Sequence, residues 1–418
     1  MSILIKQVLL DRQIQDIYIE GNQIKTIAKQ LNIKADKVID GTRKAAVPGM
    51  TNGHTHAAMT LMRGYADDMP LMPWLQQKIW PLEVNLTEED VYWGAKLACL
   101  EMIKTGTTLM VDMYHHFPAT TKAVDEMGIR GMLTFAGFDF NQPAKSETYK
   151  KTVQHYLQTM PNYSNRLKFA MGPHAIYTVS TDLLKWIRAF ASEYGLRIQS
   201  HLSETPGEVE YSLVTFGKSP AEYLESIGFL NNDVSFAHCI YLSDNDIKIL
   251  ADHGCQVVHN PASNMKLASG NKFRFADLKA AGIPISIGTD GTSSGNNLDM
   301  YEAMKLAALN GKAAWNDPTI WTAEETFKIG TEVAETLTGF KTGKIKEGYL
   351  ADICLVNLNL PEMVPNFNLI SNLVYSANGN VVDTVICDGK VLMENRYVPG
   401  EEEIMEKAEK AAFDLVKR

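Results

Sequence analysis

The sequence lacks several features by which common classes of protein are recognised. Its five cysteines are scattered along the chain, and no two of them have the CxxC spacing. This pattern excludes a disulfide framework and a zinc site built from thiolates, and it suits a reducing compartment. We therefore expect a cytoplasmic protein whose chemistry depends on side chains other than cysteine.

Long apolar runs and an excess of positive charge are also absent. No stretch approaches the ~20 uninterrupted apolar residues of a membrane-spanning helix. The apolar run at the N-terminus is too short for a signal peptide and contains Lys6. The net charge of −9 argues against a nucleic-acid surface, which needs clustered lysine and arginine. The sequence thus predicts neither a membrane nor a nucleic acid as partner.

What the chain does contain is a long alternation of short apolar segments with amphipathic stretches of helical period. Glycine often follows the helical stretches, as at Gly106 and Gly195, where a helix ends. This alternation predicts an α/β fold, a (β/α)₈ barrel of the TIM type over residues 49–345, although a doubly wound open sheet shows the same pattern. The eight apolar segments cover residues 45–56, 107–114, 129–138, 167–175, 196–204, 234–242, 255–263 and 283–291.

The two ends of the chain differ from this middle. Alternating apolar and polar residues flank a Gly-Asn pair at 21–22 and an Asp-Gly pair at 388–389. Both patterns are typical of β-hairpins. The final stretch is rich in helix formers. We therefore expect a small β-sandwich domain built from residues 1–48 and 346–418, with a C-terminal helix.

Histidines and acids fall at the ends of the predicted barrel strands. His54 and His56 end the first segment, His201 lies near the end of the fifth, and Asp290 lies near the end of the eighth. The carboxyl ends of barrel strands share one face, and side chains two apart in a strand point to the same side. These residues can therefore hold one divalent metal ion. Three nitrogens and one oxygen suit Zn²⁺ best, with Fe²⁺ or Mn²⁺ as alternatives.

Three more candidates lie at strand ends. His174 ends the fourth segment, Glu204 follows His201 by three residues, and His238 lies in the sixth segment. Taken alone, a histidine is more often a satisfied polar residue than a ligand, but the order HxH, HxxE, His, TD is far more specific than any one member. We interpret the remaining histidines as structural or surface residues: His115, His116, His155, His253 and His259.

The order and wording of these motifs resemble the amidohydrolase superfamily. The resemblance is carried by PGMTNGHTHAAMTLMRGYADDMPLMPWLQQKIWPLE, GPHAIYTVS, SHLSET, HNPASNMKLASG and IGTDGTSSGNNLDM, and it covers essentially the whole chain. The closer match is to the deaminases of 5′-methylthioadenosine and S-adenosylhomocysteine, in the group that also holds chlorohydrolase-like enzymes. The resemblance implies a metal-dependent hydrolase of cyclic amidines with a small nucleoside substrate. Relatives often form oligomers, so the resemblance is compatible with a homo-oligomer. The sequence identifies no interface.

The resemblance also implies roles for single residues. One metal ion is expected, since the fourth segment ends in His174 and lacks the lysine that bridges two metals in some relatives. Trp74 and His174 would line the nucleoside pocket, and Glu83 would hold the ribose hydroxyls. Without the resemblance, Glu83 is better explained as a solvated acid and Trp74 as a core aromatic. The implied metal ligands are His54, His56, His201 and Asp290.

These residues support hydrolytic deamination of 5′-methylthioadenosine, adenosine or 5′-deoxyadenosine to the inosine analogue and ammonia. Asp290 can take the proton of the attacking water while His238 stabilises the hydroxide that forms. Glu204 can protonate the purine ring nitrogen and then the leaving amine. In the alternative interpretation, Glu204 only orients the ligand His201.

The sequence departs from the family pattern after the third barrel strand. Members that take S-adenosylhomocysteine are expected to use arginines there for its carboxylate, but no arginine lies between Arg130 and Arg166. Lysine does not replace the arginine fork on a carboxylate. We therefore expect a preference for small or apolar 5′ groups, with the homocysteine adduct a poorer substrate. The residues found there instead are Phe135, Phe138, Phe140 and Lys145.

Two alternatives stay open. The first keeps the site and changes the substrate to another N-heterocycle, such as guanine, cytosine, a pterin or a triazine, with amino or chloro hydrolysis. The second is a barrel that has lost catalysis and serves as a scaffold. A scaffold would usually have lost a ligand or the acid, whereas all six expected positions are occupied by suitable residues.

Overall fold

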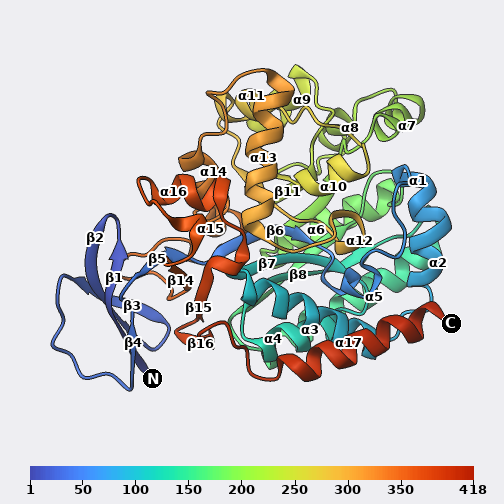
Figure 1. Cartoon of the computed structure of the whole chain (residues 1–418). Helices are drawn as coiled ribbons and strands as arrows, with labels where there is room; N and C mark the ends of the chain where they lie inside the picture. Colours follow the sequence, from blue (N-terminus) through green and yellow to red (C-terminus); the bar gives the residue numbers. More distant parts are fainter.

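Eight parallel strands form a barrel in the middle of the chain in the computed structural model, which describes residues 1–418 (Figure 1). They pair in chain order from β6 to β13. A backbone bridge between Thr55 and Asp290 joins the first strand to the turn after the last. The predicted (β/α)₈ barrel is therefore confirmed. The strands are β6 (Met50–Thr55), β7 (Thr107–Tyr114), β8 (Arg130–Gly137), β9 (Leu167–Pro173), β10 (Ile198–Leu202), β11 (Val234–His238), β12 (Gln256–His259) and β13 (Ile285–Ile287).

Helices follow each barrel strand and cover the outside of the barrel (Figure 1). Their ends follow ordinary capping chemistry: Ser180 accepts a hydrogen bond from the Leu183 N–H, and Gly195 ends the same helix at φ 63°. The principal helices are α3 (Glu88–Lys104), α4 (Phe117–Met127), α5 (Pro143–Thr159), α6 (Thr181–Tyr194), α7 (Pro206–Phe216), α8 (Pro220–Ser226), α9 (Asp244–Asp252), α10 (Pro261–Lys266), α11 (Phe275–Ala280), α12 (Thr292–Gly295) and α13 (Met300–Trp315).

Several shorter helical pieces complete the polypeptide. Between β6 and α3 the chain forms η1 (Ala57–Met62), α1 (Leu71–Trp74), η2 (Leu75–Ile79) and α2 (Trp80–Glu83). The segment η2 is a π-helix, a form that is rare and frequently found at functional sites. The remaining pieces are η3 (Met160–Asn162), α14 (Ala323–Ile329), α15 (Ala334–Thr338), η4 (Pro361–Met363), α16 (Leu369–Ser371), η5 (Asn372–Ser376) and η6 (Gly379–Val381).

A second sheet is built from both ends of the chain, as predicted. Its eight strands run β16-β15-β14-β5-β1-β2-β3, with β4 paired to β1, and the two ends meet where β14 lies antiparallel to β5. Thirteen buried residues form its own core. The strands are β1 (Ser2–Leu10), β2 (Gln13–Glu20), β3 (Gln23–Ala28), β4 (Lys37–Asp40), β5 (Lys44–Pro48), β14 (Ile353–Asn357), β15 (Val382–Cys387) and β16 (Lys390–Met393).

The two predicted hairpin turns touch each other in this sheet. Gly21 and Gly389 both have positive φ, 60° and 68°. A Cβ on Gly389 would lie 1.9 Å from the Gly21 carbonyl oxygen, so no other residue fits there. The Asn22 side-chain amide also donates to Asp388 at 3.1 Å. Contact between residues 366 positions apart therefore locks the two ends of the chain together.

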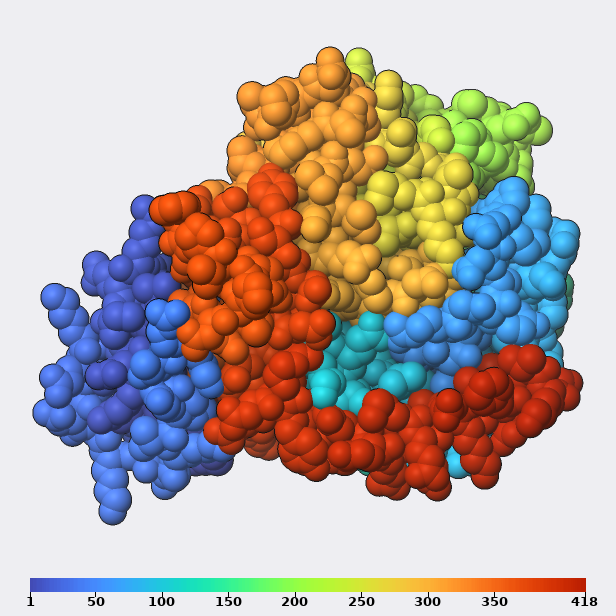
Figure 2. All heavy atoms as spheres, in the orientation of Figure 1, coloured from blue at the N-terminus to red at the C-terminus, as the bar shows by residue number.

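The C-terminal helix α17 (Glu401–Val416) lies along the barrel (Figures 1 and 2). Its residue Leu415 is buried in one apolar cluster with Trp74 and other residues of the segment after β6. Lys104 at the end of α3 pairs with Glu401 at 2.7 Å, and Arg418 pairs with Asp90 in the first turn of α3 at 2.6 Å. The helix expected to accompany the small domain is thus anchored on the barrel.

We propose domain boundaries at residues 48/49 and 345/346, where the chain passes between the two sheets. On the N-terminal side, β5 ends at Pro48 and β6 begins at Met50. None of the helices combines the length and apolar character needed to cross a lipid bilayer.

Candidate active site

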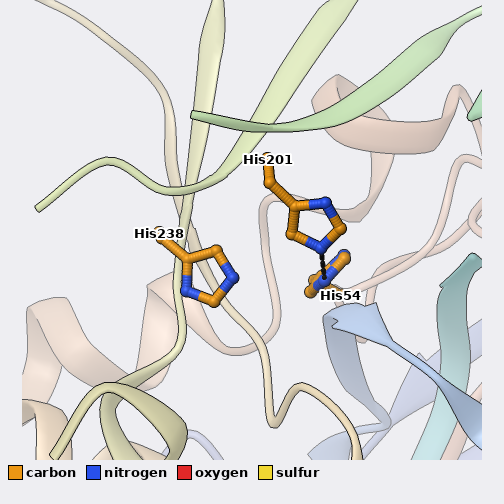
Figure 3. A group of neighbouring side chains, drawn as sticks. All are labelled: His54, His201 and His238. Carbon is orange, nitrogen blue, oxygen red and sulfur yellow. Dashed lines mark hydrogen bonds between the residues drawn. The ribbon is translucent and has the colours of Figure 1, made fainter. Parts of the chain in front are cut away.

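The four predicted metal ligands lie together at the carboxyl end of the barrel. The Nε2 atoms of His54 and His201 are 3.1 Å apart, and Asp290 Oδ1 lies 3.2 Å from His56 Nε2 and 3.6 Å from His54 Nε2. Figure 3 shows the rings of His54 and His201 with their nitrogens facing, and His238 beside them. Residues 236 positions apart in the chain, from 54 to 290, therefore present their donor atoms to one small volume.

The hydrogen bonds behind the histidines decide which ring nitrogen is free. Each Nδ1 faces an oxygen that can only accept, so each Nδ1 carries a proton, and Nε2 of the neutral ring is the atom that can bind a metal. Burial lowers the pKa of His56, but the hydrogen bond to Asp290 and the charge of Asp290 outweigh burial and raise it to about 9, so a cation would take the place of the proton on its Nε2. The donor set therefore fits a divalent cation: three imidazole nitrogens and one carboxylate oxygen. The Nδ1 contacts are His54 to Gln199 Oε1 at 2.8 Å, His56 to the Met113 carbonyl at 2.6 Å, and His201 to the His174 carbonyl at 2.8 Å.

Asp290 is held by the loop that follows the last barrel strand. Its Oδ2 accepts hydrogen bonds from the hydroxyls of Ser263 at 2.6 Å and Ser294 at 3.2 Å, which leaves Oδ1 for the histidines. Burial alone would raise the pKa of Asp290, but the hydrogen bond from His56 and the charges of the neighbouring histidines hold it well below the ordinary value. Asp290 is therefore an ionised carboxylate.

His238 differs from the three histidines above in its hydrogen bonding. The side-chain amide of Asn264 donates to its Nδ1 at 3.0 Å, so the proton of the neutral ring lies on Nε2. That Nε2 lies 3.8 Å from Glu204 Oε2, and one ring nitrogen of His238 lies within 4.8 Å of those of His54 and His201. His238 thus presents an N–H toward the space in which a ligand of the metal would lie.

Glu204 is buried against the same space. Burial, together with the negative charge of Asp290, raises its pKa to about 8. The raised pKa favours the protonated side chain, which can donate a proton. Carboxyls with raised pKa values that line a cavity are typical of catalytic acids.

The predicted substrate-binding residues line the same cavity. Trp74, Glu83 and His174 face it together with Glu204 and Asp290, and its volume is about 60 Å³. The indole N–H of Trp74 is already bonded to the Ala66 carbonyl at 3.0 Å, so this residue offers an apolar ring rather than a donor.

The inner cavity adjoins a larger groove of about 660 Å³ that shares part of its lining with it. Its surface is mainly aromatic and aliphatic, and Lys145 lies over the ring of Phe140, 5.2 Å from its centroid. The inner cavity is too small for a nucleoside, but the two spaces together match the size of small-molecule sites. The residues shared by both are Trp80, Glu83, His115, Ala136 and Phe138.

Two further residues of this wall were not among the predicted site residues. His115 Nε2 lies 3.8 Å from Glu83 Oε2, and its ring stacks on Phe138 with centroids 5.7 Å apart. The Tyr114 hydroxyl is buried without a hydrogen-bond partner and faces the inner cavity. Both residues stand at the end of β7, and that position on the catalytic face could have identified them.

Three other histidines set aside on sequence lie outside the proposed metal centre. His253 pairs with Glu225 at 3.2 Å on the surface. His259 is buried and stacks on Phe273, with centroids 4.2 Å apart. His116 binds the Leu86 carbonyl at 3.1 Å and faces only the outer groove.

Comparison with known proteins agrees with this geometry. The sequence pattern of the Amidohydrolase family matches residues 45–392, most of the chain. The chain belongs to the amidohydrolase family. A 5′-deoxyadenosine deaminase of Methanospirillum hungatei is 45% identical to it over 424 aligned positions, covering all of this chain and 94% of that protein. A 5-methylthioadenosine/S-adenosylhomocysteine deaminase of Thermococcus onnurineus is 48% identical, with 95% of each chain covered.

A solved structure shows the same architecture. The crystal structure of an adenosine deaminase from Xanthomonas campestris, with bound zinc, superposes with a TM-score of 0.92 at 29% identity. The comparison covers 100% of this chain and 98% of that one. This amidohydrolase therefore shares both its barrel and its small domain with a zinc-bound relative.

Proposed function

We propose that this amidohydrolase hydrolyses the 6-amino group of an adenosine-type nucleoside, giving the inosine analogue and ammonia. One observation carries the proposal: the buried acid Glu204 and the ionised carboxylate Asp290 face the same cavity as the imidazoles of His56 and His201. The Nε2 atom of a third imidazole, His54, lies 3.1 Å from that of His201. Relatives 43–48% identical over nearly the whole chain are named as deaminases of such nucleosides.

The residues divide the reaction between them. A divalent cation held by the three histidines and Asp290 would lower the pKa of water from ~15.7 toward ~7. Asp290 accepts the proton of the attacking water, and the N–H of His238 orients that water toward the purine. Glu204 donates its proton to the ring nitrogen next to the carbon under attack. The carboxylate that remains takes the proton of the new hydroxyl group and delivers it to the departing amine, and the proton held by Asp290 then returns Glu204 to its acid form. Proton transfers of this kind typically contribute ~10²–10⁴-fold.

We propose Zn²⁺ as the metal. The ligand set of nitrogen and one carboxylate oxygen, each held by a hydrogen bond behind it, matches the preferences of zinc. The zinc in the Xanthomonas campestris relative supports the same assignment.

The outer groove supports a preference for small or apolar 5′ groups. Neither arginine that flanks the third barrel strand is free: Arg130 pairs with Asp352 at 2.7 Å, and Arg166 pairs with Asp125 at 2.8 Å. Only Lys145 remains as a cation along the groove. We therefore propose 5′-methylthioadenosine, adenosine and 5′-deoxyadenosine as better substrates than S-adenosylhomocysteine.

The test is ammonia release from a panel of compounds, with metal quantified in the same sample. The panel contains the four nucleosides above, guanine, cytosine, a pterin and a chlorinated triazine. Turnover of an adenosine derivative with the highest kcat/KM supports the proposal. Preference for guanine or a triazine would change the proposed substrate to another N-heterocycle. A metal-free preparation without activity would favour the alternative of a non-catalytic scaffold. A clear preference for S-adenosylhomocysteine would overturn only the proposed 5′ selectivity.

A further inference from the structure

The acid Glu204 reaches the cavity because the chain bends sharply between β10 and α7. Ser203, the residue before it, has φ 49°, a left-handed conformation that non-glycine residues rarely adopt. Such a conformation persists only where surrounding contacts hold it. The spacing HxxE therefore does not by itself aim the carboxyl of Glu204 at the substrate; the bend must be held.

Glu208, in the first turn of α7, supplies those contacts. Its two carboxylate oxygens each accept a backbone N–H: Oε1 from Ser203 and Oε2 from Glu204, both at 2.9 Å. The side chain is only 5% exposed. A carboxyl group that accepts two amide protons in this forked way fixes both peptide units. Burial raises the pKa of Glu208 to about 7, and the two backbone hydrogen bonds oppose that rise because they favour the ionised form.

This arrangement is not the ordinary start of a helix. In a capping box, the third helical residue bonds back to the N-cap residue, as Glu222 does to the Ser219 N–H at 2.9 Å at the start of α8. The N-cap of α7 is Thr205, and Glu208 reaches past it to the two residues before it. The carboxylate therefore serves the bend that precedes the helix.

The same bend is tied to the loop after His238. The Ser203 carbonyl accepts hydrogen bonds from the backbone N–H groups of Ile240 at 3.1 Å and Tyr241 at 2.9 Å. The Cys239 N–H donates to the Leu202 carbonyl at 2.9 Å. A shift of the Ser203 peptide would consequently disturb the loops that carry both Glu204 and His238.

We propose that Glu208 is a positioning residue that holds Glu204 at the reacting atoms through the Ser203 bend. This inference rests on the deaminase function proposed above for Glu204. Glu208 itself does not face the cavity, so it acts through the backbone and not on the substrate.

The test compares Glu208→Gln with Glu222→Gln in the full-length, metal-loaded protein. A glutamine can accept with one atom only, and its amide N–H₂ opposes the second backbone N–H. We expect Glu208→Gln to lower kcat by ~10–100-fold while KM changes by less than about threefold and bound metal is unchanged. Glu222→Gln makes the same chemical change at a helix start that lines neither the cavity nor the groove, and it should keep the wild-type kcat.

Amide hydrogen exchange provides a readout that does not depend on activity. We expect exchange at Ser203 and Glu204 to be at least tenfold faster in Glu208→Gln than in the wild type, and unchanged in Glu222→Gln. If Glu208→Gln does not fold, Glu208→Asp replaces it, since the shorter carboxylate cannot reach both N–H groups.

The outcomes separate the two proposals. Wild-type kcat with unchanged exchange in the Glu208 variant would overturn the positioning role and leave the deaminase function standing. A loss of activity that only follows loss of metal would overturn it as well. A wild-type protein that deaminates no nucleoside would overturn the function, and faster exchange in the variant would still show that Glu208 holds the bend.

Discussion

The backbone N–H of Asp290 donates to the carbonyl oxygen of His54 at 3.0 Å. This bond lies where the first barrel strand meets the turn after the last, beside the Thr55–Asp290 bridge. The seam of the barrel and the proposed metal centre are therefore built from the same residues. A cation held there links the two edges of the sheet, so metal binding and barrel stability should be coupled.

Removal of the metal should lower the melting temperature. A ligand that binds only the folded protein stabilises it by about 2.7 kcal/mol at a free concentration 100 times its dissociation constant. In addition, the bare Nε2 lone pairs of His54 and His201 would repel each other at 3.1 Å. We expect a chelator to lower Tm by several degrees and zinc to restore it, measured by calorimetry. An Asp290→Asn variant should respond much less, and an unchanged Tm after verified metal loss would contradict the coupling.

Glu204→Gln should remove turnover while leaving the metal in place. Glutamine keeps the shape of the side chain but has no proton to give, so kcat should fall by ~10²–10⁴-fold. The matched control is Glu210→Gln, an exposed position on α7, which should keep wild-type activity. Metal content measured on the same samples decides between the two roles considered for Glu204, because weakened metal occupancy would indicate that it only orients His201.

The activity should decline on the alkaline side. Burial raises the pKa of Glu204 to about 8, and the protonated form is the one that donates to the purine. As pH rises through that pKa, the fraction of protonated Glu204 falls, and kcat should fall with it. A bound cation would move the midpoint lower, never higher. A kcat profile that stays flat from pH 7 to 10 would exclude Glu204 as the essential acid.

Much of the barrel was predictable from the sequence because its signal is local. Each of the eight apolar segments contains one of the strands β6 to β13, since strands buried on both faces read as continuous apolar runs. The position of α17 was not predictable in the same way. An amphipathic helix shows that one face will be buried, but the pairing of Arg418 with Asp90, 328 positions away, depends on the assembled fold.

In the candidate site, too, some features were predictable from local sequence patterns and others depend on the assembled fold. The proposed ligands His54, His56, His201 and Asp290 were inferred because strand ends in a barrel converge. The hydrogen bond from His54 to Gln199 and the bend at Ser203 could not be predicted, because no sequence motif indicates either of them. The place of His115 in the cavity wall was not predicted, because the sequence does not show which residue a histidine beside a strand end will contact, here Glu83.

Loss of the ion pairs between the barrel and the small domain should lower the free energy of unfolding without changing kcat. Arg130, at the start of β8, is 2% exposed and pairs with Asp352 and Asp388 of the small domain, each at 2.7 Å. Removing one partner of a buried pair leaves an uncompensated charge. Arg130→Met should therefore lower the free energy of unfolding by about 3–5 kcal/mol, measured by denaturant titration.

Two comparisons make that prediction specific. Lys248→Met breaks the exposed pair with Asp252 and should change stability by less than about 0.5 kcal/mol. Because Arg130 lies at the end of the barrel opposite the catalytic face, the folded fraction of Arg130→Met should retain the wild-type kcat. A variant as stable as the wild type, or a stable variant with impaired kcat, would contradict this division between the two ends of the barrel.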